Sequence, residues 1–572
     1  MKRNYMKCGL TAVIIAVSAA VLHGQNLKKE ITVVHDYEPE YITPAPLSIA
    51  PGQVKRADTL ENLAATYRKL NLPPTSMLTQ LRPSAIGDTL FDSSLRGYAS
   101  LAFMVRYNLA VSAGYKFLDT DRVRLNAWLQ YDGKAYKADR VNGILRSNSG
   151  ALGVQVRYAA GKNSMIDASV AYNFIRRNKV QSEYVGLDDA VINRWFDTDA
   201  HKLNFSGLWS ATSNKWSYGA GIDYQWSQLP DAVAAGGDIN VKGASANENE
   251  LGIRAYGAYG TGDNSEVRVG ARWKYYSTAV DWFDDSRSEL EINPVYTGTV
   301  DKVDLRLGIR LNAVFGGDSK VLVAPDVNVT WHTGDYVKLY LEADGKVLNN
   351  NMTTCYYRAP YTELAYTGGF TSMPIDLKAG VVYGPRDGVR FELFGGYMTS
   401  GNMLMPLTYE SGYENHGFVS PVTWQKIDIQ GWYTGVKAGY NYRHLVDVAA
   451  DYRISPQDMN RGWIYNTDRA RHCLDLRVLV TPIKSVDFTA GWNLRADRAV
   501  AMARFEPETS SVTYSLKGLG AVSDVYIKVL YRIDDNWSVM AQGSNLLNHK
   551  YDLIGNLPAQ GVTGLVGFSY KF

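Results

Sequence analysis

The residues of this sequence that could bind ions or take part in chemistry are charged side chains that alternate with apolar ones. In Val303–Phe315 the even positions include Asp, Arg and Asn, whereas nearly all odd positions are Val, Leu, Ile or Phe. Alternation at period two is typical of a strand with one polar and one apolar face. The pattern recurs along the chain and predicts that one set of charges shares a common face: Arg122, Arg124, Arg268, Arg272, Lys274, Arg306, Arg310, Asp447, Asp451, Lys528 and Arg532.

None of these charges belongs to a motif for catalysis. The sequence has no HExxH, no GxSxG and no glycine-rich phosphate loop that precedes a helix. The eight His are scattered, and we interpret His472 beside Cys473 as incidental rather than as a metal pair. We therefore expect no enzyme, no catalytic residue, no metal and no other cofactor. The net charge of +3 gives no indication of a nucleic-acid partner.

A membrane explains the two faces better than water does. A Lys or Arg that faces lipid costs about 2–4 kcal/mol at the bilayer midplane, so the charges should point into a wet lumen. Two interpretations of these lumen charges remain open. They could form an anion-leaning selectivity surface, or a network of ion pairs across a wet interior, which we favour.

The segment Trp216–Trp226 predicts how such a strand crosses the membrane. Its outward positions are aromatic at both ends and aliphatic in the middle. Ten steps of about 3.3 Å span roughly 33 Å, and a tilt of about 40° reduces this to roughly 25 Å, the height of an outer-membrane apolar band. The 39 Tyr and 13 Trp of the chain suit the interfacial belts of such a barrel. The membrane-interface aromatics that we predict here are Trp216, Tyr218, Tyr224 and Trp226.

The last residues, Gly561–Phe572, alternate in the same way and end in an aromatic residue. Bacterial outer-membrane barrels characteristically end like this. We predict that Phe568, Tyr570 and Phe572 form a C-terminal signal for the barrel-assembly machinery, and that the outer face contacts outer-membrane lipid.

The spacing of the strands predicts an all-β fold, a transmembrane antiparallel β-barrel. Short gaps with turn residues, such as Gly161–Asn163 and Gly316–Asp318, tend to alternate with long ones, such as Ala279 to about Asn293. About 20 strands are clear, and Gly97–Met104 and Met352–Ala365 would raise the number to about 22. We expect the short turns to be periplasmic and the long loops to be extracellular.

The N-terminal part differs from the rest. Residues 1–24 combine basic residues with a short apolar run and predict a signal peptide. Residues 25–95 are Pro-rich and predict an extended segment in the periplasm or in the lumen. Residues 96–572 are predicted to form the barrel.

Near its end the chain resembles a known family. Asn545–Asp552, Pro558–Gln560 and the closing Phe572 strand are similar to the end of a TonB-dependent receptor barrel. The resemblance implies about 22 strands, a plug domain and a motif that binds the transducer TonB. Residues 25–95 are shorter than such a plug, so we expect a barrel that lacks a full plug domain. The candidate TonB-contact motif is Glu30, Ile31, Thr32, Val33 and Val34.

These features predict two alternative functions in the outer membrane of a Gram-negative bacterium. The first is transport of small polar solutes, either passive or gated by a partner. The second is a non-conducting barrel that is structural or docks a partner. In both cases the partner could be a TonB-type transducer or a protein that plugs the lumen.

Overall fold

The computed structural model describes residues 95–572, apart from several connections between strands. The residues left out are 105–107, 138–140, 143, 179–180, 183–196, 231–244, 263, 281–282, 318, 360–361, 363–367, 385–387, 410–421, 444, 456–469, 507–510 and 554–556. The predicted signal peptide, the Pro-rich segment up to residue 94 and the candidate TonB-contact motif therefore lie outside the described residues and stay predictions. Within the described residues, no helix has the length and apolar character needed to cross a membrane.

The described residues are almost entirely β-strands. In chain order the elements are β1 (Gly97–Met104), β2 (Asn108–Asp119), β3 (Val123–Lys137), β4 (Val141–Asn142), β5 (Ile144–Ala159), β6 (Ser164–Asn178), β7 (Gln181–Ser182), β8 (Asp197–Ser213), β9 (Trp216–Pro230), β10 (Ser245–Gly262), β11 (Ser265–Val280), β12 (Phe283–Val300), β13 (Val303–Phe315), β14 (Lys320–His332), β15 (Val337–Asn349), α5 (Met352–Arg358), β16 (Phe370–Tyr383), β17 (Gly388–Tyr409), β18 (Val422–Tyr442), β19 (Val446–Ile454), β20 (His472–Ile483), β21 (Val486–Ala496), β22 (Arg498–Glu506), β23 (Ser511–Leu519), β24 (Val522–Arg532), β25 (Trp537–Ser544) and β26 (Thr563–Lys571).

The strands close into one barrel. Each strand of the wall pairs antiparallel with the next strand of the wall, and β1 pairs with β26 to complete the ring. The ring skips β4 and β7, which pair with each other, and the hairpin β22–β23, because β21 pairs directly with β24. Of the 24 strands in the large sheet, 22 therefore form the wall. The predicted antiparallel barrel of about 22 strands is confirmed.

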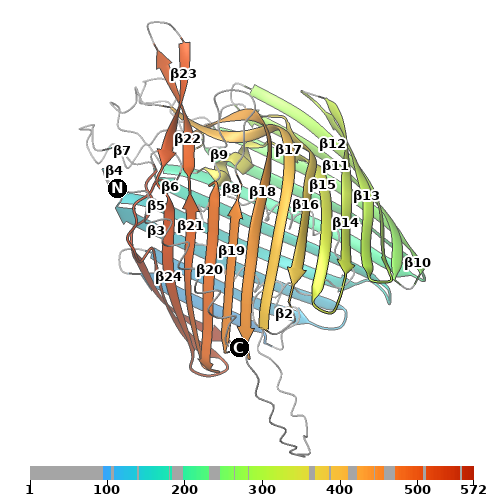
Figure 1. Cartoon of the computed structure of the whole chain (residues 1–572), viewed down its shortest axis with the longest axis horizontal. Helices are drawn as coiled ribbons and strands as arrows, with labels where there is room; N and C mark the ends of the chain where they lie inside the picture. The colour runs from blue at the N-terminus through green and yellow to red at the C-terminus, as the bar shows by residue number, and fades with distance from the viewer. Residues whose placement is uncertain are drawn as a thin grey trace, which may run out of the picture. The chain divides into compact units, whose positions relative to one another are not determined.

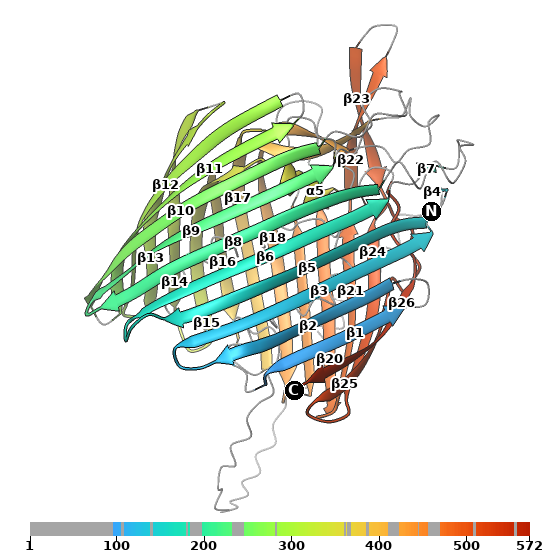
Figure 2. The same cartoon turned by 180° about the vertical axis from the view of Figure 1, so that it is seen from behind.

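The two ends of the barrel differ, as Figure 2 shows. At one end the connections are as short as 214–215 and 301–302, and both β1 and β26 begin or end there; we call it the turn end. The other, which we call the loop end, carries long connections such as 350–369 and 410–421. The two longest strands, β17 and β18, and the hairpin β22–β23 rise at the loop end (Figure 1).

Three local predictions were wrong. Met352–Ala365 is not a strand, because its first half forms the short helix α5. Ala279 to Asn293 is not a long loop, since β11 and β12 pair as far as Val280 and Phe283. The turn at Gly316 lies at the loop end, between β13 and β14, and not with the other short turns.

Candidate functional site

Alternation places one face of each strand inside the barrel. In β13, Leu307 and Ile309 are 43% and 46% exposed on the outer face, whereas Arg310 and Asn312 are 8% and 1% exposed. The same alternation assigns nearly all predicted lumen charges to the inner faces of β3, β11, β13, β19 and β24. Arg122 differs, because it lies in the turn between β2 and β3 rather than in a strand.

One cluster of lumen charges connects β13, β14 and β15. The guanidinium of Arg306 binds both carboxylate oxygens of Asp326, with distances of 3.0 and 2.7 Å. Arg310 contacts the same Asp326 at 3.3 Å and also forms an ion pair with Asp344. Lys346 contacts the other oxygen of Asp344 at 3.0 Å. Three cations and two carboxylates thus share one continuous set of contacts.

A second cluster connects β10, β11 and β12. Arg272 contacts Glu291 at 2.9 Å and Glu289 at 3.6 Å. Lys274 forms an ion pair with Glu250. Glu289 also accepts a hydrogen bond from the hydroxyl of Tyr276 at 3.2 Å.

The other predicted lumen charges have varied surroundings. Arg124 contacts Asp119 at 3.4 Å, Arg477 contacts Asp447 at 3.3 Å, and Arg532 pairs with Asp487. The guanidinium of Arg268 lies 4.4 Å from the ring centroid of Tyr256. Asp451 and Lys528 lie on the inner faces of β19 and β24.

These contacts favour the ion-pair network over a surface of one sign. A charge removed from water is costly unless an opposite charge and hydrogen bonds compensate it. The clusters around Arg310 and Arg272 provide both, on adjacent strands of a closed wall. A lumen lined in this way is polar and carries contacting charges of both signs.

The sequence prediction missed the acids of the second cluster for an identifiable reason. Glu289 and Glu291 fall in the stretch that we predicted as a loop, because Asp284–Ser288 is polar on both faces. The structure shows that β12 continues through this stretch. Glu248 and Glu250 could have been found, since they continue the inward positions of β10 at period two.

The helix α5 lies within the connection between β15 and β16 and is short enough to need external support. Asn351 is its N-cap, and the Asn351 side chain accepts a hydrogen bond from the backbone N–H of Thr354 at 2.8 Å. At the other end the N–H of Ala359 donates to the carbonyl of Cys355 at 2.9 Å. A helix of seven residues is not stable by itself. Its stability must come from contacts with the wall.

Glu248 on β10 provides the first of these contacts. Its carboxylate accepts hydrogen bonds from the backbone N–H groups of Met352 at 2.8 Å and Thr353 at 2.7 Å. The hydroxyls of Thr353 and Thr278 also donate to it, at 2.6 and 3.1 Å. Glu248 is only 5% exposed, so these four donors satisfy a buried carboxylate at the start of α5.

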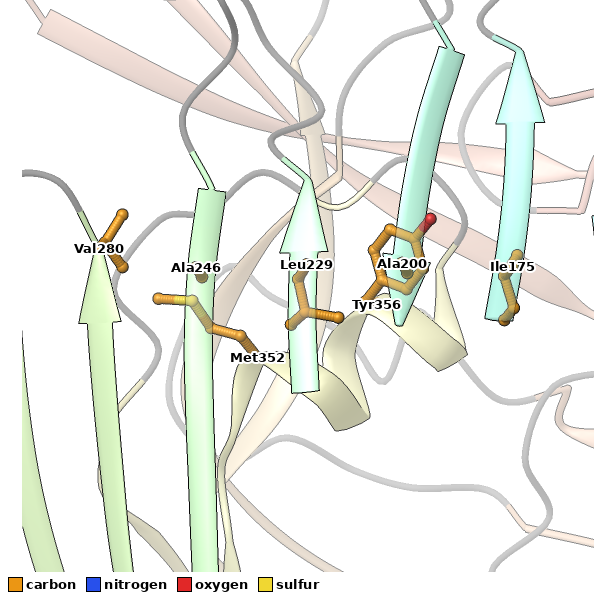
Figure 3. Close-up of a cluster of buried hydrophobic side chains, with 7 residues drawn as sticks. All are labelled: Ile175, Ala200, Leu229, Ala246, Val280, Met352 and Tyr356. Atoms are coloured by element: carbon orange, nitrogen blue, oxygen red, sulfur yellow. The ribbon is translucent and has the colours of Figure 1, made fainter. Parts of the chain in front are cut away.

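An apolar cluster provides the second contact. Met352 and Tyr356 of α5 pack against inward side chains at the loop ends of β6, β8, β9, β10 and β11, as Figure 3 shows. The wall residues of this cluster are Ile175, Ala200, Leu229, Ala246 and Val280. Full burial of a side chain such as Met or Leu contributes about 1.5–3 kcal/mol. This cluster therefore stabilises the docked position of α5.

Other residues of the same connection contact β17 and β18. Cys355 and Ala359 are fully buried in a cluster with Trp424 and two aliphatic residues. The indole N–H of Trp424 donates to the hydroxyl of Thr362 at 3.3 Å. Arg358 lies 4.7 Å from the Trp424 ring and donates to the backbone of β17.

Arg287 on β12 fixes the base of the connection. It is 4% exposed and donates to the carbonyl of Gly369 at 2.6 Å and to the side chain of Asn349 at 3.0 Å. Asp285 forms an ion pair with it at 2.6 Å. Gly369 has φ of +114°, a backbone conformation that side chains other than Gly rarely adopt. Arg287 thus holds residues at both ends of the connection.

These contacts place the described residues of the connection 350–369 between two parts of the loop end of the barrel. Five wall strands, β12 to β16, lie between β11 and β17, yet α5 and the residues around it contact both. We call this connection the mouth loop.

The predicted interface aromatics lie on the outer face of β9. Trp216 and Tyr218 are 54% and 39% exposed and contact the rings of Tyr259 and Trp209. The hydroxyl of Tyr224 donates to an Asn side chain on β10 at 2.9 Å. Trp226 occupies the next outward position toward the loop end.

The predicted assembly residues lie where the barrel closes. Phe568 and Phe572 are about equally exposed on the outer face, at 44% and 43%. The ring of Phe572 stacks with Tyr570 and with Tyr115 of β2, at centroid distances of 5.5 and 6.0 Å. The carbonyl of Phe572 accepts a hydrogen bond from the N–H of Gly97 at 2.7 Å.

Within the described part of the chain, no group of three or more His, Cys, Asp or Glu could hold a metal ion.

Comparison with known proteins identifies the fold. No family model matches the chain, and no curated protein matches its sequence. Solved structures do match. The siderophore receptor PirA from Acinetobacter baumannii has a TM-score of 0.63 and 11% identity, over 84% of this chain and 81% of that chain.

Two further structures match in the same way. The ferripyoverdine receptor of the outer membrane of Pseudomonas aeruginosa has a TM-score of 0.60 and 12% identity, over 84% of this chain and 72% of its own. The copper transporter OprC has a TM-score of 0.59 and 13% identity, over 83% and 80% of the two chains. The chain has the barrel fold of outer-membrane receptors. At these identities the likeness shows the fold alone. At the level of the fold, it agrees with the resemblance of Asn545–Asp552 to the end of a TonB-dependent receptor barrel.

Proposed function

We propose that this protein is an outer-membrane barrel that transports small polar solutes through its lumen, and that the mouth loop controls passage. The observation that carries the proposal is the mouth loop itself, which is docked on both sides of a charged lumen. An unobstructed barrel of 22 strands would leave a wide hole in the envelope. We infer that the mouth loop reduces this hole and leaves a polar path beside it.

The fold supports the membrane location. The structures that match include a receptor of the outer membrane and a copper transporter. The exposed apolar outer face and the paired charges inside are the arrangement that a lipid-embedded barrel requires. The lining charges of both signs favour small polar solutes over large or strongly charged ones.

Reconstitution into planar lipid bilayers tests the proposal. The wild-type barrel should conduct weakly, in discrete steps. A variant in which a short Gly-Ser linker replaces residues 351–366 should conduct several-fold more, because the passage beside β8–β10 is then unobstructed. Circular dichroism and a shift in electrophoretic migration on heating would verify that both proteins are folded. A folded linker variant whose conductance is no higher than that of the wild type would contradict the proposal.

The mode of gating follows from the same barrel. Transport would be passive if the mouth loop alone controls it, or gated if a TonB-type transducer binds Glu30–Val34. Passive and gated transport can be distinguished with a chain that lacks residues 25–34. Its conductance is measured alone and with the periplasmic domain of a TonB protein. A transducer effect that survives loss of Glu30–Val34 would exclude that motif as the contact.

A docking barrel is the second candidate, and one observation favours it. At the loop end, Leu407–Tyr409 of β17 pairs in parallel with Ala501–Ala503 of β22, so the hairpin β22–β23 extends the wall outward (Figure 1). Such a raised sheet offers a surface to a partner at the cell exterior. Purification of the barrel from outer membranes in mild detergent should then yield a stoichiometric second protein, which is lost when β22–β23 is replaced by a short turn.

A further inference from the structure

Three exposed cations lie on the outer face of the barrel at the loop end. They belong to β3, β5 and β6, which lie side by side in Figure 2, and are Lys137, Arg146 and Arg176. Leu145 and Ile175, which precede the two Arg, are 4% and 8% exposed and point inward. Alternation therefore directs Arg146 and Arg176 outward. Lys137 pairs with Ile144, which is 39% exposed on the same outer face.

Strand register places the three cations in one row. Lys137 pairs with Ile144, and Ile144 is two residues from Arg146 on β5. Arg176 pairs with Asn148, which is two residues from Arg146 in the other direction. Diagonal neighbours of this kind lie about 7–8 Å apart, so the row is roughly 15 Å long. We call these three residues the cation row.

The cation row lies at the boundary of the apolar band. On β6 the outward positions from Ile166 to Phe174 are apolar or aromatic, and Arg176 is the next outward residue. Ten steps of about 3.3 Å at a tilt of about 40° separate Ile166 from Arg176 by roughly 25 Å along the membrane normal, the height of the band. The hydroxyl of Tyr131 on β3 donates to Asn148 on β5 at 3.2 Å, as suits an aromatic residue at the interface. The row is therefore level with the lipid head groups of the leaflet at the loop end.

The cation row is a local feature of the wall. In the described residues of β9 and β11, the outward positions contain no Lys or Arg. On β13 the outward residue at the loop end is Phe315, which is 50% exposed. Cations that only anchor a barrel in the membrane have no reason to gather on three adjacent strands. Their grouping indicates a ligand that contacts all three.

The cation row carries a net positive charge. Asp199 on β8 contacts Arg176 at 3.5 Å, and both side chains are about half exposed. Among the residues that the structure describes, none forms an ion pair with Lys137 or Arg146. Like charges on neighbouring positions of a sheet destabilise it, so an anion that bridges them is favourable.

A lipid phosphate fits this row better than other anions do. The guanidinium of Arg matches the oxygens of a phosphate group, and Lys binds phosphate as a point charge. Below the row the outer face is apolar, since Leu152 and Val170 are 53% and 45% exposed. A phosphate group on a lipid contacts the cations while its acyl chains cover these apolar side chains. Three cations over roughly 15 Å match two phosphate groups rather than one.

We propose that the cation row binds a diphosphorylated lipid in the leaflet at the loop end. The two phosphate groups bridge Lys137, Arg146 and Arg176, and the acyl chains lie against the apolar outer faces of β5 and β6. The site rests on the membrane location in the proposed function, but it is independent of conduction through the lumen. Loss of lipid binding would therefore leave the transport proposal intact, and an insulating barrel would leave this site intact.

Lipid binding to the purified full chain tests the site without any measurement of conduction. Native mass spectrometry in detergent micelles measures the binding of diphosphoryl lipid A, with monophosphoryl lipid A as the comparison. We expect the diphosphoryl form to bind at least several-fold more tightly, because only this form supplies two phosphate groups. Inorganic phosphate in excess should not displace it, since the acyl chains hold the lipid. Displacement by inorganic phosphate would show a site for the free anion and would overturn the lipid site.

A double variant, Lys137→Gln with Arg146→Gln, removes two cations from the row. Each Lys or Arg beside an anionic lipid contributes about fivefold to affinity, so this variant should bind roughly 25-fold more weakly. Arg471→Gln with Lys550→Gln is the matched control, because it removes the same two residue types from exposed positions of the loop end outside the row. Lys137→Arg with Arg146→Lys keeps both charges and should bind within a few-fold of the wild type. Equal losses in the two Gln variants, or equal binding of the two lipid A forms, would each overturn the proposal.

Discussion

Glu248 and Thr353 are joined by two hydrogen bonds, one from the backbone N–H of Thr353 at 2.7 Å and one from its hydroxyl at 2.6 Å, although 105 positions separate them in the chain. The first residue belongs to the wall of the barrel and the second to the mouth loop. Because the carboxylate is buried, loss of its charge would weaken all four hydrogen bonds that it accepts.

Glu248→Gln should therefore loosen α5 without unfolding the barrel. Hydrogen bonds to a charged group contribute about 1.5–3 kcal/mol, so amide exchange in residues 352–358 should accelerate by roughly 10- to 100-fold. Hydrogen–deuterium exchange with mass spectrometry measures this directly. Glu266→Gln, on the inner face of β11 near the turn end, is the control and should leave α5 unchanged. Unchanged exchange in the Glu248 variant would show that the apolar cluster alone holds the helix.

Arg287→Ala should destabilise the loop end more severely. Removal of a buried partner leaves Asp285 uncompensated and deprives the carbonyl of Gly369 of its donor, at a cost of about 3–5 kcal/mol. Thermal unfolding in detergent micelles should show a clearly lower midpoint. The control is Arg176→Ala, which breaks an exposed ion pair with Asp199 and should cost about 0–1 kcal/mol. Equal losses in both variants would contradict the role of Arg287.

The barrel could be predicted from the sequence because lipid outside and water inside impose the alternation of apolar and polar residues. The pattern persists wherever a strand crosses the apolar band, as in Val303–Phe315 and in Trp216–Trp226. It fails at the loop end of β12, where the outward residues Asp284, Ser286 and Ser288 are polar like the inward Asp285 and Arg287. This is why Asp284–Ser288 of β12 was predicted as a loop.

The mouth loop could not be predicted for a different reason. Met352–Arg358 contains Thr, Cys and two Tyr, residues that favour strands at least as much as helices. Its helical form depends on partners that are distant in the chain, such as Glu248 and Trp424. The acidic partners of the lumen cations were likewise set by strand register, which a single sequence does not reveal.

Arg310→Ala should change the ion selectivity of the lumen. Arg310 contacts both Asp326 and Asp344, so its loss leaves two carboxylates with less positive charge beside them. Carboxylates that line a pore favour cations. The reversal potential in a KCl gradient should shift toward the potassium potential relative to the wild type. Asn312→Ala, on the same face of β13, changes no charge and should leave the reversal potential unchanged.

Arginine substitutions along the outer face of β9 test the position of the membrane. Ile222 is 44% exposed in the middle of this face and Trp216 is 54% exposed at its turn end. An Arg at the bilayer midplane costs about 2–4 kcal/mol and near an interface about 0–1 kcal/mol. Urea unfolding in phospholipid vesicles should therefore show a large loss of stability for Ile222→Arg and a small one for Trp216→Arg.

A substitution on the inner face of β9 provides the control for this test. Gln225 lies on β9 near Ile222 but points into the lumen, between Glu250 and Asn204 on the adjacent strands. Gln225→Arg introduces the same charge into a wet and partly acidic environment, so its free energy of unfolding should remain close to that of the wild type. If Gln225→Arg and Ile222→Arg destabilise the barrel equally, then the two faces of β9 do not separate lipid from water, and the membrane placement is wrong.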